Sequence, residues 1–213
     1  MALRRAALRL YLITDPVLCA PMGVVETVRR AVAGGVSMVQ LRDKRATTAQ
    51  RLALARGLME ALKGTGVPLI VNDDLEAAIL SGADGAHIGQ SDGSPQKARA
   101  LLGPDRILGL SCETPQTVAA ATGTPVDYLG LGPVFATGTK TDHENPIGIA
   151  GLATLVSGTD LPTVAIGGLN ASHVGDVMAA GADGLSVVSA ICGHADPRVA
   201  AAKFMSSKSG GLQ

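Results

Sequence analysis

The sequence alternates regularly between short apolar runs and longer segments with helical periodicity. Eight runs have the length and composition of buried strands, at 8–14, 38–41, 69–72, 85–88, 107–110, 128–131, 163–166 and 184–187. Helical patterns lie between them, for example at 24–33, 48–63, 94–102, 115–122, 171–179 and 197–204. Alternating strands and helices predict a parallel sheet, and eight such units predict an α/β fold of the closed (β/α)₈ type, a TIM barrel.

Composition agrees with this architecture. Hydrophobic residues make up 46% of the 213 residues while aromatic residues make up only 2%, so the core must be built from aliphatic side chains. Aliphatic cores of this kind suit parallel strands that are covered by helices. We expect a single barrel domain over residues 1–213, with a loose tail rich in Ser and Gly at 206–213.

The charge balance argues against nucleic acid and membranes as partners, because 18 basic and 18 acidic residues leave a formal charge of zero. No apolar run reaches the length that spans a bilayer. The three cysteines show no metal-ligand spacing, which fits a reducing compartment. These features predict a cytoplasmic protein that acts on small molecules, and they leave its oligomeric state open, a homo-oligomer included.

Polar residues and glycines follow seven of the eight apolar runs. They lie at 40–44, 72–74, 87–92, 111, 132–140, 167–168 and 189. In barrels of this type the chemistry is carried by the carboxyl ends of the strands. We therefore expect these residues to share one rim.

Three cations and two carboxylates dominate the expected rim. Arg42, Lys44 and Lys140 form a set that suits a polyphosphate. Asp73 and Asp92 follow neighbouring strands and could share Mg²⁺, which usually takes one or two carboxylates together with phosphate oxygens. The charged segment around Arg42 would by itself be explained equally well as solvated surface, but the combined set favours a binding site.

A second phosphate site is predicted from the last two strands. Gly167 and Gly168 follow the seventh strand, and Val188 and Ser189 follow the eighth. Loops at these two places commonly bind phosphate through backbone N–H groups. The hydroxyl-rich segment 137–139 could add further donors.

The ordered set of motifs resembles the thiamin phosphate synthase family over nearly the whole chain. The most specific pieces are Gln40-Leu41-Arg42-Asp43-Lys44, Asn72-Asp73, His87-Ile88-Gly89-Gln90-Ser91-Asp92 and Gly132-Pro133-Val134-Phe135-Ala136-Thr137-Gly138-Thr139-Lys140. The resemblance implies Mg²⁺-dependent transfer of an aminopyrimidinylmethyl group from its diphosphate to a thiazole phosphate. The products would be thiamin phosphate and pyrophosphate, formed without a protein nucleophile.

The resemblance also implies a role for each site residue. The pyrimidine diphosphate would be bound by Gln40, Arg42, Lys44, Asn72, Ser111 and Lys140, of which Arg42, Lys44, Ser111 and Lys140 would act in catalysis. Mg²⁺ would be held by Asp73 and Asp92, with Asp73 preferred over Asp74 because it directly follows Asn72. The thiazole phosphate would be bound by Thr137, Gly138, Thr139, Gly168, Val188 and Ser189.

Three alternatives remain at this stage. A thiazole tautomerase of the same superfamily would need a general acid–base residue. In that relative a His in the loop after the sixth strand has this role, whereas the corresponding segment here reads Gly132-Pro133. A non-catalytic barrel could bind a phosphorylated metabolite without turnover. A sugar-phosphate isomerase would need no Mg²⁺. We expect His87 to pack beside the site, and the sequence leaves the choice between a simple and a carboxylated thiazole open.

Overall fold

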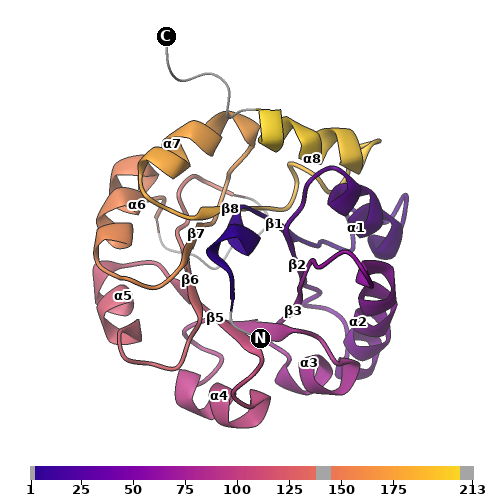
Figure 1. The fold of residues 1–213 in the computed structure, drawn as a ribbon, viewed down its shortest axis with the longest axis horizontal. Coiled ribbons are helices and arrows are strands. Elements are labelled where there is room, and N and C mark those ends of the chain that lie inside the picture. Colours follow the sequence, from indigo (N-terminus) through magenta and orange to yellow (C-terminus); the bar gives the residue numbers. More distant parts are fainter. Residues whose placement is uncertain (1–2, 138–144, 207–213) are drawn as a thin grey trace.

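Eight parallel strands close into a barrel in the order of the chain, as the alternation predicts (Figure 1). The computed structural model describes residues 3–137 and 145–206. The strands are β1 (Leu10–Ile13), β2 (Met38–Leu41), β3 (Leu69–Asn72), β4 (Gly85–Ile88), β5 (Ile107–Cys112), β6 (Tyr128–Leu131), β7 (Thr163–Ala165) and β8 (Gly184–Val187). Leu10 pairs with Leu185, and this register between β1 and β8 closes the barrel.

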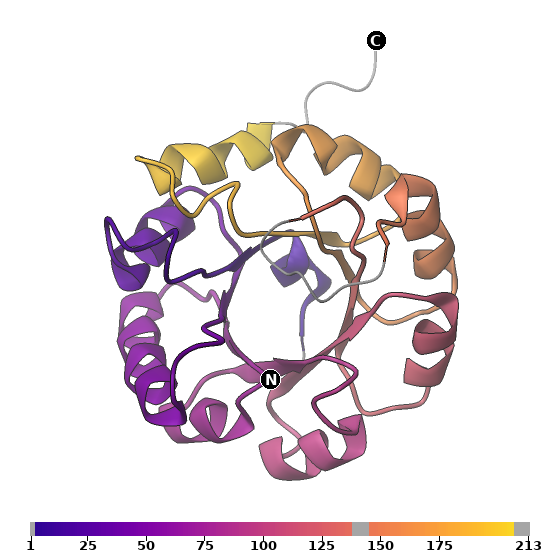
Figure 2. The same ribbon diagram turned by 180° about the vertical axis from the view of Figure 1, so that it is seen from behind.

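Helices surround the barrel on the outside, one after each strand (Figures 1 and 2). They are α1 (Val24–Ala33), α2 (Thr48–Leu62), α3 (Leu75–Ser81), α4 (Pro95–Leu102), α5 (Pro115–Ala121), α6 (Gly148–Ser157), α7 (Val174–Ala179) and α8 (Pro197–Ser206). Local capping explains several starts: Thr47 accepts the N–H of Gln50 before α2, and Thr114 does the same for Thr117 before α5.

Two hydrophobic clusters hold the layers together. The larger one fills the space between the strands and the outer helices and is mostly aliphatic. The smaller one lies inside the barrel and contains Tyr11, Met38, Ile70, Tyr128 and Val164. The interior of the barrel is thus a packed core, and the rim lies at the end of this core where the strands have their carboxyl ends.

A short 3₁₀ helix, η1 (Arg5–Leu8), lies across the amino-terminal opening of the barrel (Figure 1). Leu8 is fully buried and belongs to the interior cluster. Arg5 lies on the surface and pairs with Asp183 at 2.7 Å. This end of the barrel is therefore occupied by the chain itself, and the residues that follow the strands lie at the opposite end.

The sequence-based boundaries differ from the structure at a few places. Leu8 belongs to η1, whereas it was expected in the first strand. Strand β5 continues to Cys112, so Ser111 lies within the strand and not after it. The expected helix at 171–179 is divided into η2 (Ala171–His173) and α7, because Asn170 caps a separate 3₁₀ turn. Ser206 ends α8, and the rest of the expected tail lies outside the described residues.

Glycine is required where strand β8 passes the amino-terminal segment. A Cβ atom at Gly184 would overlap the backbone oxygen of Leu8 and the Cα atom of Arg9. Gly175 in α7 offers a contrast, because a Cβ atom there would meet nothing within 4 Å. Glycine is thus sterically required at position 184, whereas position 175 has room for a larger residue.

We expect Gly184→Ala to lower the free energy of unfolding by about 3 kcal/mol, because backbone atoms must move to admit the methyl group. Gly175→Ala should leave stability unchanged or raise it by up to about 1 kcal/mol, since alanine favours helix. Urea unfolding followed by circular dichroism measures both changes. Equal stability of the two variants would show that the close approach of β8 to residues 8 and 9 is not as described.

Candidate active site

A cavity of about 350 Å³ lies at the carboxyl ends of the strands. Every predicted site residue that the structure describes lines it: Gln40, Arg42, Lys44, Asn72, Asp73, Asp92, Ser111, Thr137, Gly168, Val188 and Ser189. Gly138, Thr139 and Lys140 lie outside the described residues. Residues that are far apart in sequence therefore share one cavity, while their individual roles remain predictions.

The carboxylates lie on one side of this cavity, where β3 and β4 end. Asp73 has a φ of 62°, the one non-glycine residue with a positive φ among those described. Its backbone N–H donates to the carbonyl oxygen of His87 at 2.9 Å, which holds this conformation. Residues in this region of backbone space cost free energy and concentrate at functional sites.

Like charges meet at this point. Partial desolvation in the cavity and the adjacent Asp92 carboxylate raise the pKa of Asp73 to about 6. Asp92 is itself held in place, because its Oδ2 accepts the backbone N–H of Gly89 at 2.7 Å. Two carboxylates forced together in this way are a natural binding site for a cation.

The cations lie on the neighbouring loop, which joins β2 to α2. The backbone N–H of Arg42 donates to the hydroxyl of Thr14 at 3.1 Å, and Thr14 is almost completely buried. Lys44 lies two residues further and is exposed on the cavity wall. The positive charges on this wall can attract an anion. A cation held between that anion and the carboxylates could link the two sides.

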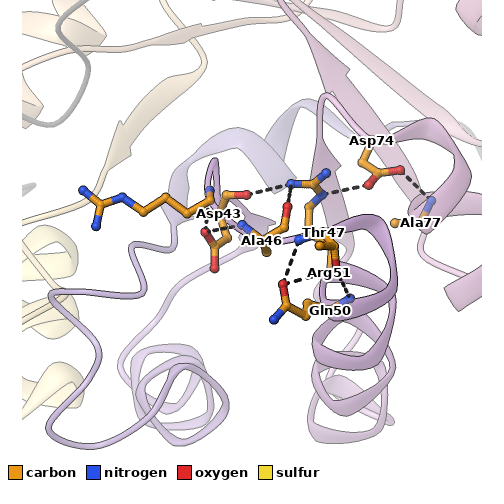
Figure 3. Close-up of polar contacts among 8 residues, drawn as sticks. Asp43, Ala46, Thr47, Gln50, Arg51, Asp74 and Ala77 are labelled. Carbon is orange, nitrogen blue, oxygen red and sulfur yellow. Dashed lines mark hydrogen bonds and ion pairs between the residues drawn. The ribbon is translucent and has the colours of Figure 1, made fainter.

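Arg51 connects the two sides (Figure 3). Its Nε donates to Asp74 Oδ2 at 2.7 Å, and its Nη1 donates to the carbonyl oxygens of Asp43 at 2.9 Å and Ala46 at 2.6 Å. The other carboxylate oxygen of Asp74 accepts the N–H of Ala77 and caps α3. Asp74 was a second candidate metal ligand from the sequence. Both of its carboxylate oxygens thus accept hydrogen bonds from the protein itself.

This contact places the loop carrying Arg42 and Lys44 against the loop carrying Asp73. The Arg51 side chain is 20% exposed and that of Asp74 is 8% exposed, so water screens the pair only in part. The guanidinium spans three acceptors at once, which a lysine ammonium cannot do with the same geometry. Arg51 is therefore a positioning residue for both sides of the cavity.

The opposite side of the cavity is built from glycines and backbone. Gly167 and Gly168 follow β7 with φ values of 91° and 65°. A Cβ atom at Gly168 would overlap the Ala136 oxygen and the Phe135 side chain, so the loop after β6 packs directly on this turn. Ser189 follows β8 on the same side. Such a surface can bind phosphate through backbone N–H groups.

The structure also adds residues that the sequence patterns did not single out for a role. Gln90 donates from Nε2 to the carbonyl oxygen of Ser111 at 2.6 Å, and Glu113 lines the cavity beyond it. Cys112 lies next to Ser111 but is buried, and burial raises the pKa of its thiol to about 11. This thiol is thus unsuited to nucleophilic chemistry.

Two further properties follow from the described part of the chain. No group of three or more His, Cys, Asp or Glu side chains there could hold a metal ion. A site with two carboxylates would therefore need other ligands, such as phosphate oxygens and water. No helix in residues 3–137 and 145–206 has the length and apolar character to cross a bilayer.

Comparison with known proteins agrees with this arrangement. The sequence profile of a family described as "Thiamine monophosphate synthase" matches residues 10–191. The chain belongs to this family. A thiamine-phosphate synthase of Azorhizobium caulinodans is 50% identical over 194 residues, which cover 91% of this chain and 92% of that protein. Another from a Psychrobacter species is 50% identical over 201 residues, covering 92% of each chain.

A solved structure gives the same picture in three dimensions. The thiamine phosphate pyrophosphorylase from Pyrococcus furiosus is 32% identical and superimposes with a TM-score of 0.87, covering 95% of this chain and 96% of that one. Members of the family are transferases, so the cavity is the candidate active site of an enzyme of that class.

We expect Arg51→Lys to weaken the binding of inorganic pyrophosphate about tenfold, because the two loops lose their common anchor. Isothermal titration calorimetry in the presence of Mg²⁺ measures the change. Arg99→Lys is the matched control. Arg99 lies on α4, is 17% exposed and pairs at 2.7 Å with Asp127, which lies at the amino ends of β5 and β6, away from the cavity. An equal loss of affinity in both variants, or no loss in either, would show that Arg51 does not position the two loops.

Proposed function

We propose that this chain transfers the 4-amino-2-methylpyrimidin-5-ylmethyl group from its diphosphate to a thiazole phosphate. The products are thiamin phosphate and pyrophosphate, within thiamin diphosphate biosynthesis. One observation carries the proposal beyond family membership: a single cavity joins a wall of cations and carboxylates to a wall of glycine and backbone. Two phosphorylated substrates could then bind at opposite walls with their reacting atoms between them.

The leaving pyrophosphate is bound at the charged wall. Arg42, Lys44 and Asn72, which line the cavity, would contact its oxygens. These contacts strengthen as negative charge develops on the departing group, which lowers the barrier to its departure. Lys140 is proposed to join them from outside the described residues.

Mg²⁺ would be held by Asp73 and Asp92, with the substrate's diphosphate completing its coordination. The raised pKa of Asp73 beside Asp92 supports this fit, because a divalent cation would relieve the repulsion between the two carboxylates. When bound, the ion would supply charge neutralisation for the pyrophosphate. Asp74 is engaged by Arg51 and Ala77, which leaves Asp73 as the carboxylate of this loop that is available to a metal.

The two heterocycles are proposed to meet in the centre of the cavity. Gln40 and Ser111 would bind the aminopyrimidine from the floor. Donors for the thiazole phosphate are proposed from Thr137, Gly168, Val188 and Ser189, together with Gly138 and Thr139 outside the described residues. The thiazole nitrogen then attacks the methylene carbon from which pyrophosphate departs, so the protein needs to orient the rings and need not supply a nucleophile.

We further propose that the enzyme works in the cytoplasm on small molecules. Its three cysteines, Cys19, Cys112 and Cys192, are buried free thiols, which supports a reducing compartment. The balanced charge supports neither nucleic acid nor a membrane surface as a partner.

Incubation of the purified protein with both substrates and Mg²⁺ should yield thiamin phosphate and an equal amount of pyrophosphate. Removal of the metal with EDTA should abolish turnover, and added Mg²⁺ should restore it. Chromatography of the products measures both. Rearrangement of the thiazole without pyrophosphate release would instead indicate a tautomerase.

Arg42→Ala should lower kcat by a factor on the order of 10², because the contact to the leaving group is lost. Arg56→Ala is the control, since Arg56 lies on α2 and donates to the carbonyl oxygen of Leu80 away from the cavity. Steady-state kinetics with both substrates compares the variants. Wild-type turnover in Arg42→Ala would refute the placement of pyrophosphate at this wall.

A further inference from the structure

A chain of hydrogen bonds runs through the inside of the barrel beneath the cavity. Gln40 Nε2 donates to the Tyr11 hydroxyl at 2.7 Å, and the hydroxyls of Tyr11 and Tyr128 are 2.9 Å apart. Tyr128 continues to His87 Nδ1 at 2.9 Å, and His87 Nε2 lies 2.9 Å from Ser111 Oγ. The five side chains come from five different strands, so only the closed barrel brings them together.

Both ends of this chain face the cavity, while its centre is sealed in the core. Gln40, Tyr11, His87 and Ser111 line the cavity floor, whereas Tyr128 is completely buried. Burial raises the pKa values of Tyr11 and Tyr128 well above that of a free phenol, so both keep their protons. The side chains of Tyr128 and His87 have room because residue 109 is glycine, since a Cβ atom at Gly109 would overlap both of them.

The single proton on each phenol limits the directions that these hydrogen bonds can take. The Tyr11–Tyr128 and Tyr128–His87 contacts could each run either way. Because Gln40 donates to Tyr11, both phenols can donate only if the Tyr11 proton points to Tyr128 and the Tyr128 proton points to His87 Nδ1. In this arrangement Nδ1 accepts a hydrogen bond and carries no proton, which puts the ring proton of His87 on Nε2. It is donated to Ser111 Oγ. Each bond polarises the next, which strengthens a chain whose bonds all point the same way.

We propose that Tyr11, Tyr128 and His87 are positioning residues that set the hydrogen-bonding polarity of the cavity floor. With its amide nitrogen bound to Tyr11, Gln40 presents its Oε1 as an acceptor, and Ser111 presents its own O–H as a donor. This inference rests on the proposed function for its ligand. The 4-amino group of the pyrimidine offers an N–H to Gln40, whereas a 4-oxo analogue offers another acceptor and is rejected.

The position of the His87 proton tests the direction of the chain without any assay of activity. ¹⁵N NMR of the labelled protein, with the His87 signals assigned by their loss in His87→Gln, should show a neutral ring protonated on Nε2. Tyr128→Phe should shift the Nδ1 signal, because its hydrogen-bond donor is removed. A proton on Nδ1 in the wild-type protein would overturn the inference.

Substrate discrimination tests the consequence of that direction. In Tyr11→Phe the Gln40 amide can rotate, so the ratio of kcat/KM for the 4-amino over the 4-oxo pyrimidine diphosphate should fall at least tenfold. Thr27→Val is the control, because it removes a buried hydroxyl that donates to Gly23 in the first turn of α1. Its ratio should equal that of the wild type.

The two experiments separate the inference from the proposed function. An unchanged ratio in a folded Tyr11→Phe variant that still makes thiamin phosphate would overturn the polarity assignment alone. A wild-type protein that makes no thiamin phosphate would overturn the proposed function, while the His87 proton would still decide the direction of the chain.

Discussion

Closure of the parallel barrel is the constraint on which every other feature depends. The pairing of β1 with β8 brings the carboxyl ends of all eight strands to one rim, and η1 occupies the opposite opening. Charged, amide and glycine groups that are separated by up to about two thirds of the chain can then line one cavity of about 350 Å³. The helices outside contribute mainly stability, so the loops after the strands are left to carry the chemistry.

Within that rim, groups of opposite charge are held at fixed positions around one cavity. The Asp73 and Asp92 carboxylates repel each other, and Asp73 is held at a φ of 62°. Beside them, Arg51 joins Asp74 to the backbone of the loop that carries Arg42. The proposed binding of a cation together with pyrophosphate would relieve the repulsion between the two carboxylates.

Sequence patterns were sufficient for the parts of the molecule that depend on local periodicity. All eight strands were expected close to where they lie, and residues that follow a strand reach the rim by geometry alone. Two helices were not among the segments singled out. Leu75–Ser81 is only seven residues long, and Gly148–Ser157 is apolar nearly all round and contains two glycines, so neither shows a clear polar face.

Groups that act through distant contacts could not be predicted from sequence. Arg51 reads as an ordinary charge on a helix until the fold brings it to Asp74, 23 residues away. Tyr11 and Tyr128 read as buried strand residues, yet their hydroxyls meet across 117 residues of chain. Family resemblance supplies expected roles for the rim residues, whereas the supporting contacts beneath and beside them are visible only in the structure.

A crystal structure of the protein with Mg²⁺ and inorganic pyrophosphate would test the central claim most directly. The account predicts pyrophosphate in contact with Arg42 and Lys44. It also predicts a metal ion that is coordinated by Asp73, Asp92 and oxygens of the pyrophosphate. Pyrophosphate bound elsewhere, or a metal ion that contacts neither carboxylate, would contradict it.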